Sequence, residues 1–121
     1  MYKMELKTSE KVLLINMSGF MTRTESLGCV KELENKIKEV NPTQYNIVVD
    51  ADGLKTSSPE LVGHMEKALD MISNTPFKMR FSILPKDIIA TSQVKRVGRV
   101  DDKFKDTIFV GSYEEALDLI G

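Results

Sequence analysis

The sequence predicts a single α/β domain built on a mixed, mostly parallel sheet. Two short strand-like stretches open the chain, and amphipathic helical stretches then alternate with strand-like ones, in the order β-β-α-β-α-β-α-β-α. Strands separated by helices of this length are joined by right-handed crossovers, which leave the strands parallel in one sheet. No linker, repeat or low-complexity tract divides the 121 residues, so one domain over residues 1–121 is expected.

The first two strands are expected to form an antiparallel hairpin. Every second residue over Tyr2–Leu6 is apolar, which is the pattern of a strand with one face in water. The apolar stretch Val12–Ile15 follows after a short turn at Ser9-Glu10, and so short a connection leaves no room for a parallel crossover. Ser18-Gly19 is expected to end the second strand.

The first helix is predicted between Thr22 and Asn41. Apolar residues recur there at steps of three and four: Leu27, Val30, Leu33, Ile37 and Val40. Thr22 and Glu25 have the spacing of a capping box. The β-branched run Ile47–Val49 suits a strand buried on both faces, and Asp50–Gly53 is expected to form the turn that ends it.

The second helix is predicted from about Ser58 to Asn74. Pro59 suits its first turn, and one apolar stripe runs along it: Leu61, Met65, Ala68, Leu69 and Ile72. A strand is expected over Phe77–Leu84.

The third helix is predicted after Pro85, with Gly98 as its stop. Thr107–Val110 is expected to form the last strand. Ser112 and Glu115 have the spacing of a second capping box, which opens the last helix.

Composition excludes several classes of protein. The chain is 41% hydrophobic and 29% charged with a net charge of −1, as in an ordinary globular protein and unlike a general polyanion binder. Its longest unbroken apolar run, Val12–Ile15, is far below the ~18 residues of a membrane span, and no apolar signal segment follows Met1. The single cysteine, Cys29, fits a reducing cytoplasm.

Evidence for an enzyme is weak. His64 is the single histidine, it falls inside the predicted second helix, and the sequence has no metal-ligand spacing of the HExxH or CxxC type. Cys29 lies within the first predicted helix and is most simply a packing residue. We therefore expect no catalytic residue, no bound metal and no cofactor.

Asp50 and Asp52 leave one alternative open. They stand at the end of the third predicted strand, where open α/β sheets usually bind ligands. Two carboxylates there could form an anion or metal loop that holds Mg²⁺. The favoured interpretation is that Asp52-Gly53 simply makes the turn.

Three hydroxyl residues, Thr56, Ser57 and Ser58, stand directly before the second predicted helix. One of them is expected to cap the helix, and Glu60 could complete a capping box with Ser57. The same place would stabilise a phosphoserine, because a helix N-terminus favours negative charge. Capping is the favoured interpretation from spacing alone.

The charges are unevenly distributed. Between Pro76 and Lys105 there are eight basic and three acidic residues, a net charge of +5, so the rest of the chain carries −6. This asymmetry suits either a face for an acidic protein partner or a solvated surface. No aromatic residue falls among residues 86–103, so a stacking platform for nucleic acid is not expected.

Three stretches together resemble one known family. Val12–Gly19 resembles its second strand, Ile47–Leu54 its strand and following turn, and Phe104–Leu117 its closing strand and helix. In this order and spacing the chain resembles the STAS domain family, which includes bacterial anti-sigma factor antagonists of the stage II sporulation protein AA type. The resemblance implies the same α/β fold over nearly the whole chain.

The resemblance also implies a site. Family members carry an Asp-Ser-Ser-Gly-Leu loop before the second helix, in which a serine kinase that is also the anti-sigma factor phosphorylates one serine. The matching stretch here is Thr56–Leu61, in which Ser57 and Ser58 are the phosphoacceptor candidates. The aspartate before the serines is missing, and Pro59-Glu60 replaces Ser-Gly.

The expected function is that of a non-enzymatic cytoplasmic protein-interaction module, of the anti-sigma factor antagonist type, controlled by serine phosphorylation. Its partner would be an anti-sigma factor or a serine kinase, with no nucleic acid and no membrane span. The expected partner-binding residues lie in the loop and on the exposed face of the second helix: Lys55, Thr56, Ser57, Ser58, Glu60, His64 and Lys67.

Two alternatives remain. A group of proteins related to the sporulation antagonist lacks the serine motif and is suspected of carrying apolar ligands, so this chain could carry a small apolar molecule or lipid without a phospho-switch. The other alternative is an enzyme that uses Asp50 and Asp52 with a divalent metal.

Overall fold

The predicted alternation of strands and helices is confirmed by the computed structural model, which describes residues 1–121 apart from the side chain of Asp101. The strands are β1 (Tyr2–Lys7), β2 (Val12–Gly19), β3 (Asn46–Leu54), β4 (Arg80–Ile83) and β5 (Thr107–Phe109). The α-helices are α1 (Arg23–Glu39), α2 (Pro59–Ser73), α3 (Ile88–Arg99) and α4 (Tyr113–Ile120). Two 3₁₀ turns complete the order, η1 (Pro42–Gln44) before β3 and η2 (Val100–Asp102) after α3.

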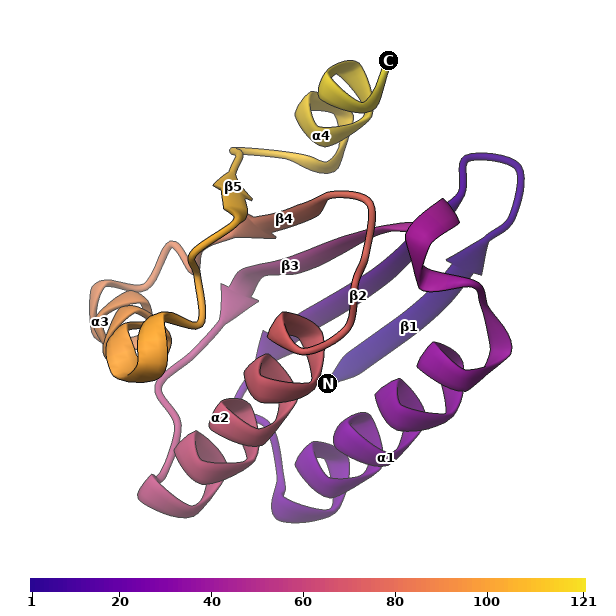
Figure 1. The fold of residues 1–121 in the computed structure, drawn as a ribbon. Coiled ribbons are helices and arrows are strands. Elements are labelled where there is room, and N and C mark those ends of the chain that lie inside the picture. The colour runs from indigo at the N-terminus through magenta and orange to yellow at the C-terminus, as the bar shows by residue number, and fades with distance from the viewer.

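The strands form one mixed sheet in the order β1-β2-β3-β4-β5 (Figure 1). β1 pairs antiparallel with β2, from Tyr2 opposite Met17 to Lys7 opposite Val12, so the predicted hairpin is confirmed. All other pairs are parallel. The carboxyl ends of β2, β3 and β4 therefore meet at one edge of the sheet.

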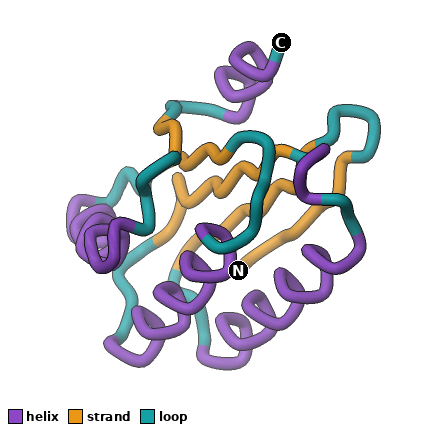
Figure 2. The backbone as a smooth tube through the Cα atoms, in the orientation of Figure 1, coloured by secondary structure: helices purple, strands orange, loops and turns teal.

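Helices cover both faces of the sheet. α1 and α2 lie side by side on one face, and α4 packs against the other (Figure 2). Successive β2 side chains point to opposite faces, so Leu13 and Ile15 join the core under α1 and α2, while Val12 and Leu14 join the core under α4. In the described part of the chain, no helix is long and apolar enough to cross a membrane.

The start of α1 follows the sequence closely. Thr22 caps the helix by accepting a hydrogen bond from the Glu25 N–H at 3.1 Å, and the Glu25 carboxylate accepts one from the Thr22 N–H at 3.1 Å. The predicted capping box is therefore confirmed. The box predicted for α4 is only half formed, because Ser112 caps the helix while the Glu115 carboxylate accepts from Gly111 instead.

β3 continues where a turn was predicted. It runs to Leu54, and its pairing with β2 shifts between Asn16 and Ser18, so an irregularity absorbs the turn-forming residues within the strand. The Asp50 carboxylate accepts a hydrogen bond from the Asp52 N–H at 3.0 Å. The prediction of a turn at Asp50–Gly53 was therefore wrong, because this local bond satisfies the backbone inside an extended strand.

β4 is shorter than predicted, and the residues before it belong to the connection from α2. Phe77 is buried in the core under α1 and α2. The Arg80 guanidinium donates hydrogen bonds to the carbonyls of Ile72 and Thr75 at 3.2 and 2.7 Å, so it caps the end of α2. The backbone of Lys78 and Met79 is hydrogen-bonded to Tyr45 and Ile47 at the start of β3, so the connection joins the sheet only just before Arg80.

Gly98 does not stop α3, which continues to Arg99. The glycine is needed for packing: a Cβ there would lie 2.0 Å from the Cε2 atom of Phe104. Phe104 packs in the same small core as Val94 and Leu54, and this core holds α3 at the carboxyl edge of the sheet. The prediction of a stop at Gly98 mistook a packing glycine for a helix end.

Gly98→Ala is therefore expected to lower the free energy of unfolding by about 1–3 kcal/mol, the usual cost of overpacking a core. Gly63→Ala is the matched control, because a Cβ at this glycine in α2 would meet nothing within 4 Å. That control should be neutral or stabilise by roughly 0.5–1 kcal/mol. Urea denaturation of both variants measures the difference, and equal stabilities would contradict the packing role of Gly98.

Candidate functional site

The candidate site is the connection between β3 and α2, Lys55–Ser58, here called the Ser58 loop. It begins at the carboxyl edge of the sheet, where the Lys55 N–H donates a hydrogen bond to the Gly19 carbonyl at 3.0 Å. Lys55, Thr56 and Ser58 are exposed and Ser57 is half-buried. The stretch that the sequence singled out is therefore largely open to other molecules.

A single side chain of α3 holds the middle of this loop. The Ser57 N–H donates to Gln93 Oε1 at 2.8 Å, and Gln93 Nε2 donates to the Ser57 carbonyl at 2.8 Å. One amide group thus satisfies both backbone groups of Ser57. Nothing in the sequence marked Gln93, because a glutamine on a polar helix face has no motif and its partner is 36 residues away.

Ser58 caps α2. Its Oγ accepts the Leu61 N–H at 3.4 Å, a long hydrogen bond, while the hydroxyl itself stays exposed. A capping box of Ser57 and Glu60, which the spacing suggested, is not formed. Glu60 instead pairs with Arg23 at the start of α1, with 2.8 Å between Arg23 Nε and Glu60 Oε1. Sequence reasoning missed Arg23, which is distant from the loop along the chain.

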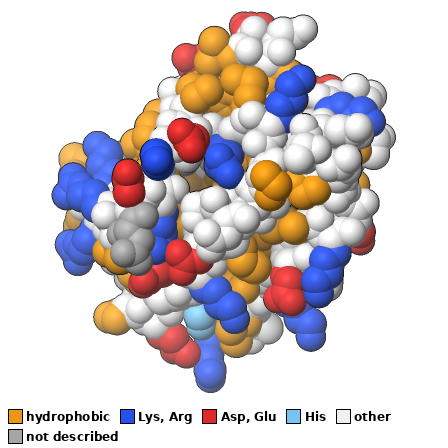
Figure 3. Space-filling model, viewed as in Figure 1, with side chains coloured by type: hydrophobic (Ala, Val, Ile, Leu, Met, Phe, Trp, Pro, Cys, Tyr) orange, Lys and Arg blue, Asp and Glu red, His pale blue; other side chains and the backbone are white. Residues whose placement is uncertain are grey.

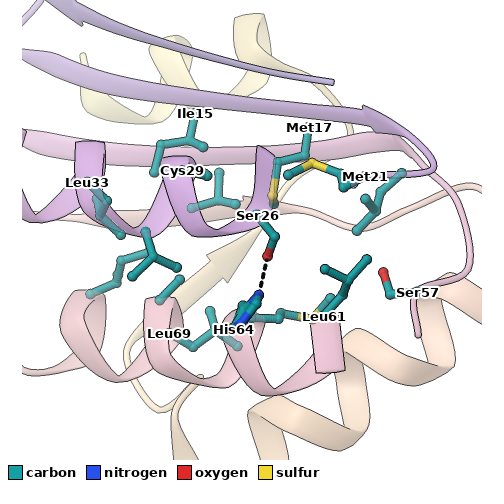
Figure 4. Close-up of a pocket in the computed structure, with 16 residues that line it drawn as sticks. Ile15, Met17, Met21, Ser26, Cys29, Leu33, Ser57, Leu61, His64 and Leu69 are labelled. Atoms are coloured by element: carbon teal, nitrogen blue, oxygen red, sulfur yellow. Dashed lines mark hydrogen bonds between the residues drawn. The ribbon is translucent and has the colours of Figure 1, made fainter. Parts of the chain in front are cut away.

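His64 is half-buried on α2 rather than exposed as expected, and its role in partner binding stays a prediction. Its Nδ1 lies 2.9 Å from the Oγ of Ser26 on α1, and both side chains line a cavity between the two helices (Figure 4). Lys67 is exposed, but it follows Ser58 by nine residues, or about 13 Å along the helix. The predicted site residues thus form one group at the loop and the start of α2, from which His64 and Lys67 stand apart.

The cavity lies beneath the Ser58 loop, between α1, α2 and the sheet. Its volume is about 70 Å³. Its lining is almost entirely apolar and includes Met17, Met21, Cys29, Val49, Leu61 and Met65. The polar side chains on its wall are Ser26, Ser57 and His64. The loop and the cavity therefore share a wall at Ser57.

Cys29 is not placed to act as a nucleophile. Its side chain is 7% exposed, and burial, together with the nearby Glu32 carboxylate, raises the pKa of the thiol to about 11. The thiol therefore stays protonated near neutral pH, whereas the thiolate is the reactive form. The interpretation of Cys29 as a packing residue agrees with this burial.

Asp50 and Asp52 are engaged within β3 and its surroundings. Beyond the bond between them, the Asp52 carboxylate lies 3.5 Å from the Lys86 ammonium. Among the residues whose side chains are described, no three His, Cys, Asp or Glu groups come together as a metal site would require. Asp52 is therefore engaged in an ion pair and Asp50 in a local hydrogen bond, and the two do not form a cation site with a third described ligand.

Exposed apolar side chains stand at the same edge of the sheet as the Ser58 loop. Phe20, directly after β2, is 74% exposed, and Ile88 and Ile89 at the start of α3 are 82% and 61% exposed. The Lys86 N–H donates to the Asp52 carbonyl at 3.1 Å, which ties the connection before α3 to the end of β3. Large exposed apolar side chains are typical of interaction surfaces when they form a contiguous patch.

Comparisons with known proteins show which solved structures this fold is similar to. No protein-family model and no curated protein sequence matches the chain. Among solved structures it is similar to an anti-sigma factor antagonist from Mycobacterium paratuberculosis, with a TM-score of 0.63 and 10% identity over 99% of this chain and 94% of that one.

Two structures of the Bacillus anti-sigma factor antagonist SpoIIAA are also similar. The phosphorylated form has a TM-score of 0.61 and 16% identity, with both chains covered completely. The unphosphorylated form has a TM-score of 0.60 and 16% identity over 99% of this chain and 96% of that one. The chain therefore has the STAS fold of the anti-sigma factor antagonists, as its sequence predicted.

Proposed function

We propose that this chain is a non-enzymatic regulatory module that binds a protein partner through the Ser58 loop. The observation that carries the proposal is the exposed hydroxyl of Ser58 at the N-terminus of α2, on a loop that Gln93 holds in place. A loop that is ordered before binding loses little conformational freedom in a complex. This arrangement suits recognition by another protein.

The similar structures support a partner of a particular kind. They are anti-sigma factor antagonists, and one is described in a phosphorylated form. By analogy of fold, the partner of this chain is an anti-sigma factor or a serine kinase.

The proposed binding surface joins polar and apolar parts. Lys55, Thr56, Ser58 and Glu60 supply exposed polar groups, and Phe20, Ile88 and Ile89 supply exposed apolar area at the same edge of the sheet. Apolar anchors surrounded by polar groups are the usual anatomy of a protein interface. Ser57 and His64 support this surface from beneath, and Lys67 lies at its margin or beyond.

Ser58 is the proposed phosphoacceptor, in preference to Ser57. Ser58 is exposed, whereas Ser57 is half-buried against the cavity and held through its backbone. A phosphate adds about −1.5 to −2 charges near neutral pH, and the N-terminus of α2 stabilises them. Arg23, now paired with Glu60 in the first turn of α2, would be shared with the phosphate.

Ser58→Asp is expected to abolish capture of the protein partner from an extract of the source cells. Aspartate caps a helix as well as serine does, so the fold should be kept while a negative charge is added. Ser9→Asp is the matched control, because it adds the same charge in the exposed turn between β1 and β2, at the opposite end of the sheet.

Quantitative mass spectrometry of the captured proteins gives the result. Equal capture by wild type and Ser58→Asp would contradict the switch. A partner lost equally with Ser9→Asp would show a non-specific charge effect and count against the proposed surface. Phosphate mapped to Ser57 after treatment with a captured kinase would move the acceptor site.

One observation favours a second candidate function, the carriage of a small apolar ligand. The cavity beneath the Ser58 loop is almost entirely apolar, as a carrier site requires. At about 70 Å³ it is well below the roughly 300 Å³ of a small ligand pocket, so α1 and α2 would have to separate around a lipid. The ligand that fits without such movement is a molecule of a few heavy atoms.

Native mass spectrometry of the purified protein separates the two functions. A carrier would retain an additional mass that disappears in Ala68→Phe, a substitution that fills the cavity wall. Met71→Phe, on the same helix outside the lining of this cavity, is the control. The protein-binding proposal predicts a bare chain of 121 residues in all three samples.

A further inference from the structure

The helices α3 and α4 carry opposite charges on their outer faces. α3 contains three basic residues and no acidic one, and Lys95, Arg96 and Arg99 are all exposed. α4 contains three acidic residues and no basic one: Glu114, Glu115 and Asp118, all exposed. Figure 3 shows the blue basic side chains gathered at the left of the view, where Figure 1 places α3.

Most of these charges have no ion-pair partner among the side chains that the structure describes. Glu115 accepts the N–H of Gly111, but no ion pair is found for the other acidic and basic groups of α3 and α4 within the described residues. This contrasts with α1, where Lys36 and Lys38 each pair with a glutamate of the same helix. The two faces are therefore free to pair with charges on another molecule.

The spacing of the charges matches. Lys95 and Arg99 are four residues apart, as are Glu114 and Asp118, so each pair spans about 6 Å along its helix. An antiparallel arrangement of the two helices places Arg99 opposite Glu114 and Lys95 opposite Asp118. Both ion pairs can therefore form at the same time in a single alignment of the two helices.

Apolar side chains fit the same arrangement. Leu119, 52% exposed, follows Asp118 directly. Because the helices run in opposite directions, it falls on the side of Lys95 that leads back toward Ile88 and Ile89, which begin α3. In the parallel register the same leucine would instead lie opposite Val100, which is 47% exposed, so exposed apolar area accompanies the ion pairs in either register.

We propose that α3 of one copy of this chain docks against α4 of a second copy. In Figure 1 the two helices lie at separate corners of the molecule, with β5 between them, so one copy can offer both faces at once. The two surfaces differ, so the contact is head-to-tail, and repeating it builds a ring or an open chain. Exposed ion pairs are weak and are screened by salt. The fraction of associated chains therefore rises with protein concentration, and the affinity rises at low ionic strength.

Charge reversal tests this with the full chain. Lys95→Glu/Arg99→Glu reverses α3, and Glu114→Lys/Asp118→Lys reverses α4. Analytical ultracentrifugation at about 0.01 M and 0.15 M ionic strength compares each with wild type, because these conditions change the screening length about fourfold. Each variant alone should associate at least about tenfold more weakly than wild type at low ionic strength.

Rescue separates the proposal from a general effect of charge or a folding defect. An equimolar mixture of the two variants restores both kinds of contact and should associate like wild type. Lys31→Glu/Lys78→Glu is the matched control for the α3 reversal, because it changes the net charge by the same amount at exposed positions outside α3 and α4. A monomeric wild type at low salt, association untouched by either reversal, or failure of the mixture would each overturn the proposal, whatever the fate of the Ser58 loop.

Discussion

The hydrogen bonds between the Gln93 side chain and the backbone of Ser57 are the contact on which the candidate site depends. Without them, nothing described in the structure would hold both backbone groups of Ser57, and the loop would be fixed only at its ends, at Lys55 and at the cap of α2. Two neutral hydrogen bonds contribute only about 1 kcal/mol each to stability. Their importance lies in position, because they join the loop to α3.

Through Gln93, the Ser58 loop and α3 are joined into one surface at the carboxyl edge of the sheet. α3 is packed against Leu54 through Val94, and its last turn depends on the close approach of Phe104 to Gly98. The same helix begins with the exposed Ile88 and Ile89. A partner that covers these isoleucines and Ser58 would therefore contact groups that α3 holds in place. Charge added at Ser58 would act on a surface with little freedom to rearrange. The cavity behind Ser57 is the part of this region that remains loosely filled.

Sequence reasoning succeeded where the signal was local or periodic. The order of elements, the hairpin and the capping box at Thr22 all depend on residues close together in the chain, and the STAS fold followed from the order of the elements and their local sequences. It failed where a distant residue decided the outcome. Phe104 gives Gly98 its role, Arg23 takes Glu60 from the predicted capping box, and Ser26 turns His64 inward. Gln93 could not have been found, because its function appears only when α3 is brought beside the loop.

Amide hydrogen exchange at Ser57, followed by NMR, tests most directly whether Gln93 holds the loop. The account predicts slow exchange of the Ser57 N–H in the wild-type chain and fast exchange in Gln93→Leu, while the amide of Val48 in the centre of the sheet stays equally protected in both. A Ser57 amide that exchanges at the rate of an unstructured peptide in the wild type, or that stays protected without Gln93, would contradict it.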